Sequence, residues 1–148
     1  MLRISTRGRY AVRMLVHLAS CSTGKATISK EEIARAEGIS PQYAEQILTR
    51  LKTAGVVASH RGRRGGYTLS KDPSAITLKD LLEVTEGKFE IVPCLTSSAC
   101  ARKDRCVMYP VWNKINAAVE HLVAGITLRE LANRAEEIKT QNSPTFEI

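Results

Sequence analysis

The sequence contains no long hydrophobic run. None of its apolar stretches approaches the roughly eighteen residues that a membrane-spanning helix requires. The opening segment MLRISTRGRY also lacks the apolar core and the small-residue cleavage site of a secretion signal. We therefore expect a cytoplasmic protein that makes no contact with a membrane.

The short motifs of common enzymes are also missing. The sequence has no C-x-x-C pair, no glycine-rich cofactor loop and no paired catalytic residues. An electron-transfer or thiol-redox enzyme is therefore the least favoured interpretation of the four cysteines, and we expect the protein not to be an enzyme. Because cytoplasmic thiols are normally reduced, the cysteines indicate metal binding or redox sensing before disulfides.

Positive charge is concentrated in the first half of the chain. The net charge is +7, but residues 1–71 contain thirteen Lys and Arg against four Asp and Glu, whereas residues 72–148 contain nine against eleven. Such a local excess attracts a polyanion such as DNA, although a solvated basic surface that maintains solubility has the same composition. Local motifs decide between these two interpretations.

Hydrophobic periodicity and capping residues predict a mainly α-helical protein with one small β-hairpin. The 148 residues, 43% of them hydrophobic, are enough for one compact core and an interface. Capping signals at Ser29, Ser40 and Thr77 each precede a helical pattern of apolar residues. We expect helices over about 6–20, 30–37, 41–54, 78–86, 110–125 and 128–138, a hairpin over 56–69, turns over 88–109 and a disordered tail over 139–148.

The second and third predicted helices form a candidate helix-turn-helix. Ala34 lets the two helices approach closely, and Gly38 permits the sharp turn between them. The third helix of such a motif enters the major groove, so the exposed residues of its first turns are candidates for contacts with base edges: Gln42, Tyr43, Glu45, Gln46 and Thr49. A carboxylate accepts from the amino group of cytosine but repels phosphate, so Glu45 is either a specificity element or an ordinary solvated acid.

A basic, glycine-rich hairpin follows the candidate helix-turn-helix directly. Its turn, RGRRGG, carries Arg61, Arg63 and Arg64, which can reach the DNA backbone or a minor groove. Helix pairs with glycine turns occur in many folds, but here the pair and the hairpin share the basic half of the chain. Together they predict a winged helix-turn-helix over residues 1–72 that binds double-stranded DNA.

The predicted helix over 110–125 carries two neighbouring apolar stripes. One consists of Val111, Ile115, Ala118 and Leu122, and the other of Trp112, Val119, Val123 and Ile126. One stripe can pack on the chain's own core and the other on a second subunit, although a helix at the centre of a monomer has the same pattern. We favour a homodimer, in which residues 73–138 form a linker helix, a cysteine loop and the dimerisation helices.

Three cysteines, Cys94, Cys100 and Cys106, are evenly spaced in the predicted turns. A loop of this kind suits an iron–sulfur cluster, because its thiolates must converge on the cluster from several directions. Three soft ligands also suit zinc, although structural zinc sites usually use closer pairs and a fourth Cys or His. Unligated cysteines are the third interpretation. Cys21 lies far from this loop in the sequence, and we expect it to be a bystander.

These features together resemble a known family. The segments MLRISTRGRYAV, GIS-x2-Y-x-EQ-x3-RL, RG-x2-GGY-x-L and C-x5-C-x5-C are similar to the Rrf2 family of regulators, which includes the iron–sulfur regulators of the IscR and NsrR types. The resemblance covers about residues 1–138 and implies a winged-helix fold, a dimer made through the long helix and binding to partly palindromic operators. It also implies that Tyr43, Glu45, Gln46 and Arg61 contact DNA.

The fourth cluster ligand departs from the family pattern. IscR-like members place a histidine three residues after the third cysteine, where this chain has Tyr109. NsrR-like members take a carboxylate from the partner's N-terminal helix, whereas the corresponding stretch here is Arg7-Gly8-Arg9. Glu90, Asp104, a histidine from elsewhere or a small exogenous ligand stay open as the fourth ligand.

We therefore interpret the chain as a homodimeric DNA-binding transcriptional regulator. By family resemblance it is a repressor whose operator affinity is controlled by a 2Fe-2S or 4Fe-4S cluster that senses redox, iron or nitric oxide status. The alternatives are a winged-helix regulator with a structural zinc ion, and one without a metal that responds to a partner protein or a metabolite.

Overall fold

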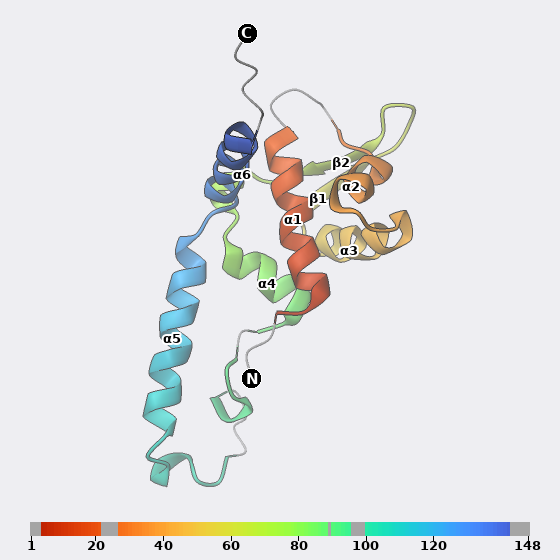
Figure 1. Cartoon of the computed structure of the whole chain (residues 1–148). Coiled ribbons are helices and arrows are strands. Elements are labelled where there is room, and N and C mark those ends of the chain that lie inside the picture. The colour runs from red at the N-terminus through yellow and green to blue at the C-terminus, as the bar shows by residue number, and fades with distance from the viewer. Residues whose placement is uncertain (1–3, 22–26, 89, 96–99, 143–148) are drawn as a thin grey trace.

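The computed structural model describes residues 4–21, 27–88, 90–95 and 100–142 (Figure 1). It is mainly helical with one two-stranded antiparallel sheet, as predicted. In chain order the elements are α1 (Thr6–Cys21), α2 (Lys30–Glu37), α3 (Pro41–Thr53), β1 (Val57–His60), β2 (Gly66–Leu69), η1 (Pro73–Ala75), α4 (Leu78–Glu86), η2 (Pro93–Leu95), η3 (Lys103–Arg105), α5 (Tyr109–Gly125) and α6 (Leu128–Asn142).

Helix α1 lies at the centre of the core. It packs against α2 and α3 on one side and against α4 and α6 on the other (Figure 1). Its buried positions recur with helical spacing, and they are Gly8, Ala11, Met14, Leu15, Leu18 and Ala19. Ile76, Leu81 and Leu128 belong to the same buried cluster as the residues of α1 and α3. Residues on both sides of the predicted division at residue 72 therefore share one core.

The predicted capping residues begin the helices. The side chain of Ser29 accepts a hydrogen bond from the backbone amide of Glu32, and that of Ser40 accepts one from the amide of Tyr43. Thr77 forms a complete capping box with Asp80 at the start of α4. Gly38 ends α2 in the left-handed conformation, with φ of 66°, which permits the sharp turn into α3.

The hairpin forms the predicted wing. Strands β1 and β2 pair in an antiparallel register that sets Val57 opposite Leu69 and His60 opposite Gly66. Ile28 forms a single antiparallel bridge with Tyr67, so the segment before α2 lies along the outer edge of β2. Gly66 has φ of 154°, and a Cβ atom there would lie 2.5 Å from the carbonyl oxygen of Ile28. This close backbone contact requires glycine.

The long helix α5 lies along one side of the molecule, and its lower end extends beyond the core (Figure 1). Lys79 of α4 and Glu120 of α5 form an ion pair at 3.6 Å. Of the two predicted stripes, the one that contains Trp112 and Val123 is buried or half-buried, whereas the one that contains Val111, Ile115, Ala118 and Leu122 is exposed. One apolar face of α5 therefore packs on its own chain and the other has no cover within the described chain.

The last helix is longer than predicted. We expected a disordered tail from residue 139, but α6 continues to Asn142, so the prediction is wrong for residues 139–142. The sequence there contains no helix breaker, and Lys139 pairs with Glu136 at 2.7 Å while Thr140 donates to the carbonyl of Glu136. The remainder of that tail, 143–148, lies outside the described residues. Among the described helices, none is both long and apolar enough to span a bilayer.

Candidate nucleic-acid interface and cysteine loop

Helix α3 presents a polar face next to the wing. Its apolar residues, Ala44, Ile47, Leu48 and Leu51, are buried against the core and fix the rotation of the helix. The opposite face is exposed and carries Gln42, Glu45, Gln46 and Thr49, as the sequence predicted. The hydroxyl of Thr49 donates to the carbonyl of Glu45 at 2.8 Å, so this hydroxyl already has an acceptor within the helix. The amide and carboxylate side chains are the groups that the helix presents to a ligand.

Tyr43 differs from the other predicted contact residues because it is half-buried. Its ring packs edge-to-face on Tyr10 of α1, with the ring centroids 6.0 Å apart. The guanidinium of Arg13 lies 5.4 Å from the centroid of the Tyr10 ring. These contacts anchor the first turn of α3 on α1 while part of Tyr43 stays accessible.

Glu45 forms an ion pair that the sequence did not predict. Its Oε2 atom lies 2.9 Å from Nζ of Lys30, the first residue of α2. The hydrogen bond to Glu45 raises the pKa of Lys30 above its ordinary value. The pair links the two helices of the helix-turn-helix and gives the Glu45 carboxylate a preferred position before any contact with DNA. No sequence spacing signals it, because it depends on how α2 and α3 pack.

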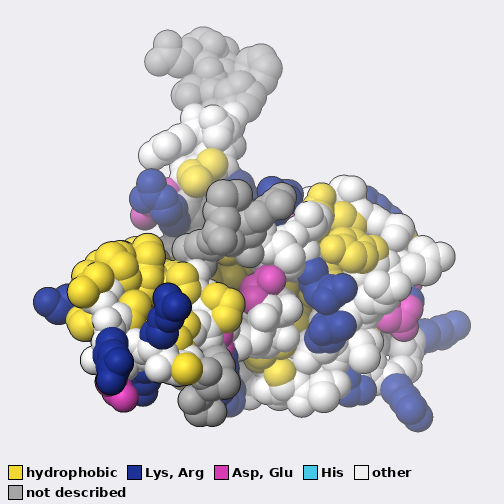
Figure 2. Space-filling model, turned by 90° about the horizontal axis from the view of Figure 1, so that it is seen from below, with side chains coloured by type: hydrophobic (Ala, Val, Ile, Leu, Met, Phe, Trp, Pro, Cys, Tyr) yellow, Lys and Arg dark blue, Asp and Glu magenta, His cyan; other side chains and the backbone are white. Residues whose placement is uncertain are grey.

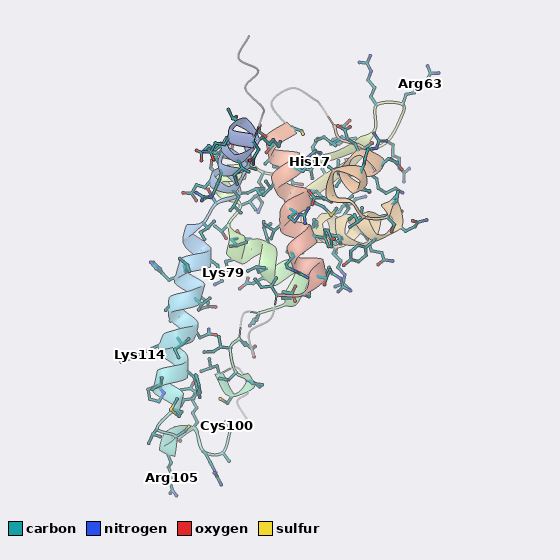
Figure 3. All side chains as sticks on the ribbon, viewed as in Figure 1. His17, Arg63, Lys79, Cys100, Arg105 and Lys114 are labelled. Carbon is teal, nitrogen blue, oxygen red and sulfur yellow. The ribbon has the colours of Figure 1, made fainter. Side chains whose placement is uncertain are left out.

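The wing carries its three arginines on an exposed turn. Arg61, Arg63 and Arg64 are exposed, and Arg63 projects from the tip of the wing, away from the body of the protein (Figure 3). The hydroxyl of Thr27 donates to the carbonyl of Arg64 at 2.6 Å and ties the turn to the segment before α2. The wing therefore has an anchored base and an exposed, positively charged tip that suits contacts with phosphate.

The three cysteines of the candidate cluster site lie in the segment between α4 and α5. Cys94 is in η2, Cys100 precedes η3, and Cys106 follows η3. All three are half-buried free thiols, as is Cys21 at the end of α1. In Figure 3 Cys100 and Arg63 lie at opposite ends of the molecule. Any coupling between the cysteines and the predicted DNA contacts of the wing therefore has to cross most of the length of the molecule.

The described part of the cysteine segment shows no preformed metal site. Within the described chain, no three His, Cys, Asp or Glu side chains gather closely enough to bind a metal ion. Tyr109 starts α5, and its ring has Nζ of Lys103 at 5.1 Å from the centroid. Of the two carboxylates that stay open as a fourth ligand, Asp104 is exposed and Glu90 is half-buried. The donor set suits a cluster, but its assembly requires the loop to rearrange around the ligand.

The fold and the basic face define the chain as a winged-helix DNA-binding protein. The family model Rrf2, described as an iron-dependent transcriptional regulator, matches residues 4–134. The chain therefore belongs to the Rrf2 family of transcriptional regulators, as the sequence motifs indicated.

Curated relatives support the same assignment over nearly the whole chain. The chain is 32% identical over 147 residues to the HTH-type transcriptional regulator IscR of Yersinia enterocolitica, covering 97% of this chain and 89% of that protein. It is 32% identical over 136 residues to IscR of Klebsiella pneumoniae, covering 91% and 82%.

Two solved structures share the fold. The global cysteine regulator CymR of B. subtilis matches with a TM-score of 0.74 and 36% identity, over 90% of this chain and 98% of that one. The IscR structure of T. potens matches with a TM-score of 0.74 and 33% identity, over 93% and 91%. The chain is thus similar both to regulators named IscR and to a protein described as a global cysteine regulator.

Proposed function

We propose that the chain represses transcription by binding an operator in double-stranded DNA as a homodimer. The observation that carries this proposal is that α3, with exposed Gln42, Glu45 and Gln46, packs on β1 of the wing, whose turn carries exposed arginines. In winged helix-turn-helix proteins the helix contacts base edges and the basic residues contact the phosphate backbone. Tyr43 packs on Tyr10 from a half-buried position and keeps part of its side chain accessible to a ligand.

The exposed face of α5 supports the dimer. Leu122 is 64% exposed, and Val111 and Ile115 are each 42% exposed, all on one stripe of the helix. Figure 2 shows hydrophobic side chains gathered over the part of the surface where α5 lies. A second copy that packs the same stripe against this one would remove it from water in a two-fold symmetric interface. The two recognition helices would then bind half-sites about one helical turn of DNA, roughly 34 Å, apart.

We further propose that Cys94, Cys100 and Cys106 hold an iron–sulfur cluster. Three free thiols on one segment of short turns are the donors that such clusters use, and the segment leads directly into α5. The cluster would supply a group that is lost or altered by oxygen, nitric oxide or iron shortage. Ligation would fix the segment against the start of α5, and its release would change how two α5 helices pack and how the recognition helices are spaced.

Anaerobic purification tests this proposal directly. Visible absorption and analyses of iron, sulfide and zinc are measured for the wild type, for Cys100→Ala and for Cys21→Ala as the matched control. We expect a coloured wild type that contains iron and sulfide, a Cys100→Ala variant that loses them, and a Cys21→Ala variant that retains them. A colourless protein that contains zinc, or one that resists reconstitution with iron and sulfide, contradicts the cluster.

A second candidate function is a regulator that uses no cluster. Two observations favour it: the described residues hold no preformed metal site, and a similar structure is that of a global cysteine regulator. In this case a metabolite or a partner protein sets the operator affinity. Replacement of Cys94, Cys100 and Cys106 together distinguishes the two candidates, because only the cluster-free regulator keeps its response in cells.

A further inference from the structure

A cavity of about 550 Å³ lies between α1, α2 and α6, away from both the DNA-contacting face and the cysteine segment. Its apolar wall is formed by Val12 and Val16 of α1 and by Leu131, Ala135 and Ile138 of α6. A volume of this size is within the usual range for small-molecule sites, which are mostly apolar with a few polar groups.

The apolar wall is incompletely covered by the fold itself. Val12, Val16, Leu131 and Ala135 are only half-buried, and Ile138 is 50% exposed, although α1 and α6 pack side by side. The small side chain of Ala135 at the centre of this face leaves the space unfilled. Apolar side chains that face a cavity instead of one another gain burial when an apolar ligand enters.

The charged groups at the cavity favour an anion. Among the described lining residues, the cations are Arg13, Arg134 and Lys139, and the only carboxylate is Glu37. Nε of Arg13 lies 2.6 Å from Oε2 of Glu37, so these two charges compensate each other. Lys139 pairs with Glu136 at 2.7 Å. Arg134 is exposed and pairs with no carboxylate of the described chain, so its guanidinium is available to a ligand.

We propose that this cavity binds a small amphipathic carboxylate, whose apolar body lies between Val16 and Ala135 and whose carboxylate pairs with Arg134. Arginine suits this role because its planar guanidinium donates two parallel hydrogen bonds to a carboxylate. The ion pair between Arg13 and Glu37, both of which line the cavity, adds no net charge to it.

The position of the cavity connects its ligand to regulation. Glu37 lines the cavity and is the last residue of α2, directly before the turn into α3. The other wall is α6, which follows α5 after two residues. A ligand that bridges α2 and α6 therefore links the helix-turn-helix to the helix that carries the exposed apolar stripe. This regulatory consequence rests on the proposed function, whereas binding of the ligand does not.

Calorimetric titration with octanoate tests the binding without DNA. The neutral and cationic counterparts, 1-octanol and octylamine, are the matched ligands. We expect octanoate to bind one site per chain, Arg134→Gln to weaken it about tenfold or more through loss of a charged hydrogen bond, and Ala135→Phe to abolish it by filling the cavity. Asn133→Phe, an exposed position on α6 that does not line the cavity, is expected to bind octanoate like the wild type.

The contrary results are equally specific. Octylamine or 1-octanol binding as tightly as octanoate contradicts the anion preference, and undiminished binding by Ala135→Phe contradicts the location. No binding by the wild type, together with weaker self-association of Ala135→Phe, shows that a second copy covers the cavity and overturns the proposal. Circular dichroism confirms that each variant is folded, and Arg134→Gln changes only an exposed side chain.

The regulatory step has its own measurement. Operator affinity is compared with and without saturating octanoate, and we expect a change of about fivefold or more, which is the lower end of typical allosteric coupling. Ala135→Phe should remove this response. If octanoate binds but operator affinity does not change, only the regulatory step is wrong. If the protein binds no operator under any condition, the proposed function is wrong and the ligand site is unaffected.

Discussion

The DNA-contacting half and the segment from the cysteines through α5 differ in how far one chain completes them. In the first half, Met14, Leu15 and Ile47 are fully buried, and Ser29 and Ser40 cap their helices. Among the residues of α5, which the structure describes in full, only Val123 is buried, and Leu122 is 64% exposed. The winged helix is therefore covered by its own chain, whereas α5 keeps an exposed apolar stripe, which we propose a second subunit covers.

The largest effect that separates the two regions is expected at the exposed stripe of α5. Leu122→Asp places a carboxylate in the proposed dimer interface, where desolvation of a charge costs several kcal/mol, so we expect self-association to weaken by about a hundredfold or more. Analytical ultracentrifugation measures this change, and Asn113→Asp, exposed on the same helix, is the control. A Leu122→Asp protein that remains dimeric shows that the interface lies elsewhere.

The next effect concerns backbone geometry in the wing. Gly66→Ala introduces a Cβ atom 2.5 Å from the carbonyl oxygen of Ile28 at a φ of 154°, so we expect a loss of about 1–3 kcal/mol in the free energy of unfolding. Gly125→Ala, at the end of α5, meets no atom within 4 Å and should change stability by less than about 1 kcal/mol. Urea unfolding compares the two variants. Equal effects would show that the wing is no more tightly constrained than α5.

A smaller effect is expected when single positive charges in the two regions are removed. Arg63→Gln is expected to weaken operator binding and to reduce the slope of log affinity against log salt by about 0.9, the value for one phosphate contact. Lys88→Gln, an exposed cation that follows α4, should leave both quantities unchanged. Fluorescence anisotropy at several salt concentrations provides the measurement. An unchanged slope for Arg63→Gln would show that the wing tip does not contact the DNA backbone.

The smallest effect concerns Lys30 and Glu45. The hydrogen bond to Glu45 raises the pKa of Lys30 above 10.5, so the stability that this pair contributes is fully present below pH 10.5 and is lost as the pH rises through the raised pKa. Lys30→Gln should therefore be slightly less stable than the wild type at pH 8, and the difference should disappear at high pH. Lys52→Gln, an exposed cation of α3, is the control. If the difference in stability between Lys30→Gln and the wild type persists at high pH, the effect comes from packing and not from charge.

The sequence predicted what local chemistry determines and missed what tertiary packing determines. Ser40, Thr77 and Gly38 fixed helix boundaries correctly because capping acts within a few residues. The two stripes of α5 were also predicted, and the structure shows which of them is exposed.

Three features were beyond local reasoning. The half-burial of Tyr43 on Tyr10 and the pairing of Glu45 with Lys30 both depend on contacts between separate helices. The extension of α6 to Asn142, by contrast, was a local error, because Lys139 lies three residues after Glu136 and pairs with it on the same helix. The cysteine spacing suggested a cluster, but the spacing alone cannot bring three thiols together or supply a fourth ligand.

The most direct measurement of the central claim is the operator affinity of one preparation before and after its cluster is removed. Anaerobic titrations at a fixed salt concentration compare the cluster-loaded protein, the same protein after nitric oxide or air exposure, and the Cys100→Ala variant. We predict that loss of the cluster changes operator affinity about fivefold or more, and that Cys100→Ala binds like the exposed protein in both atmospheres. Equal affinity in all three samples would contradict cluster control of DNA binding, while leaving the winged helix as the DNA-binding unit.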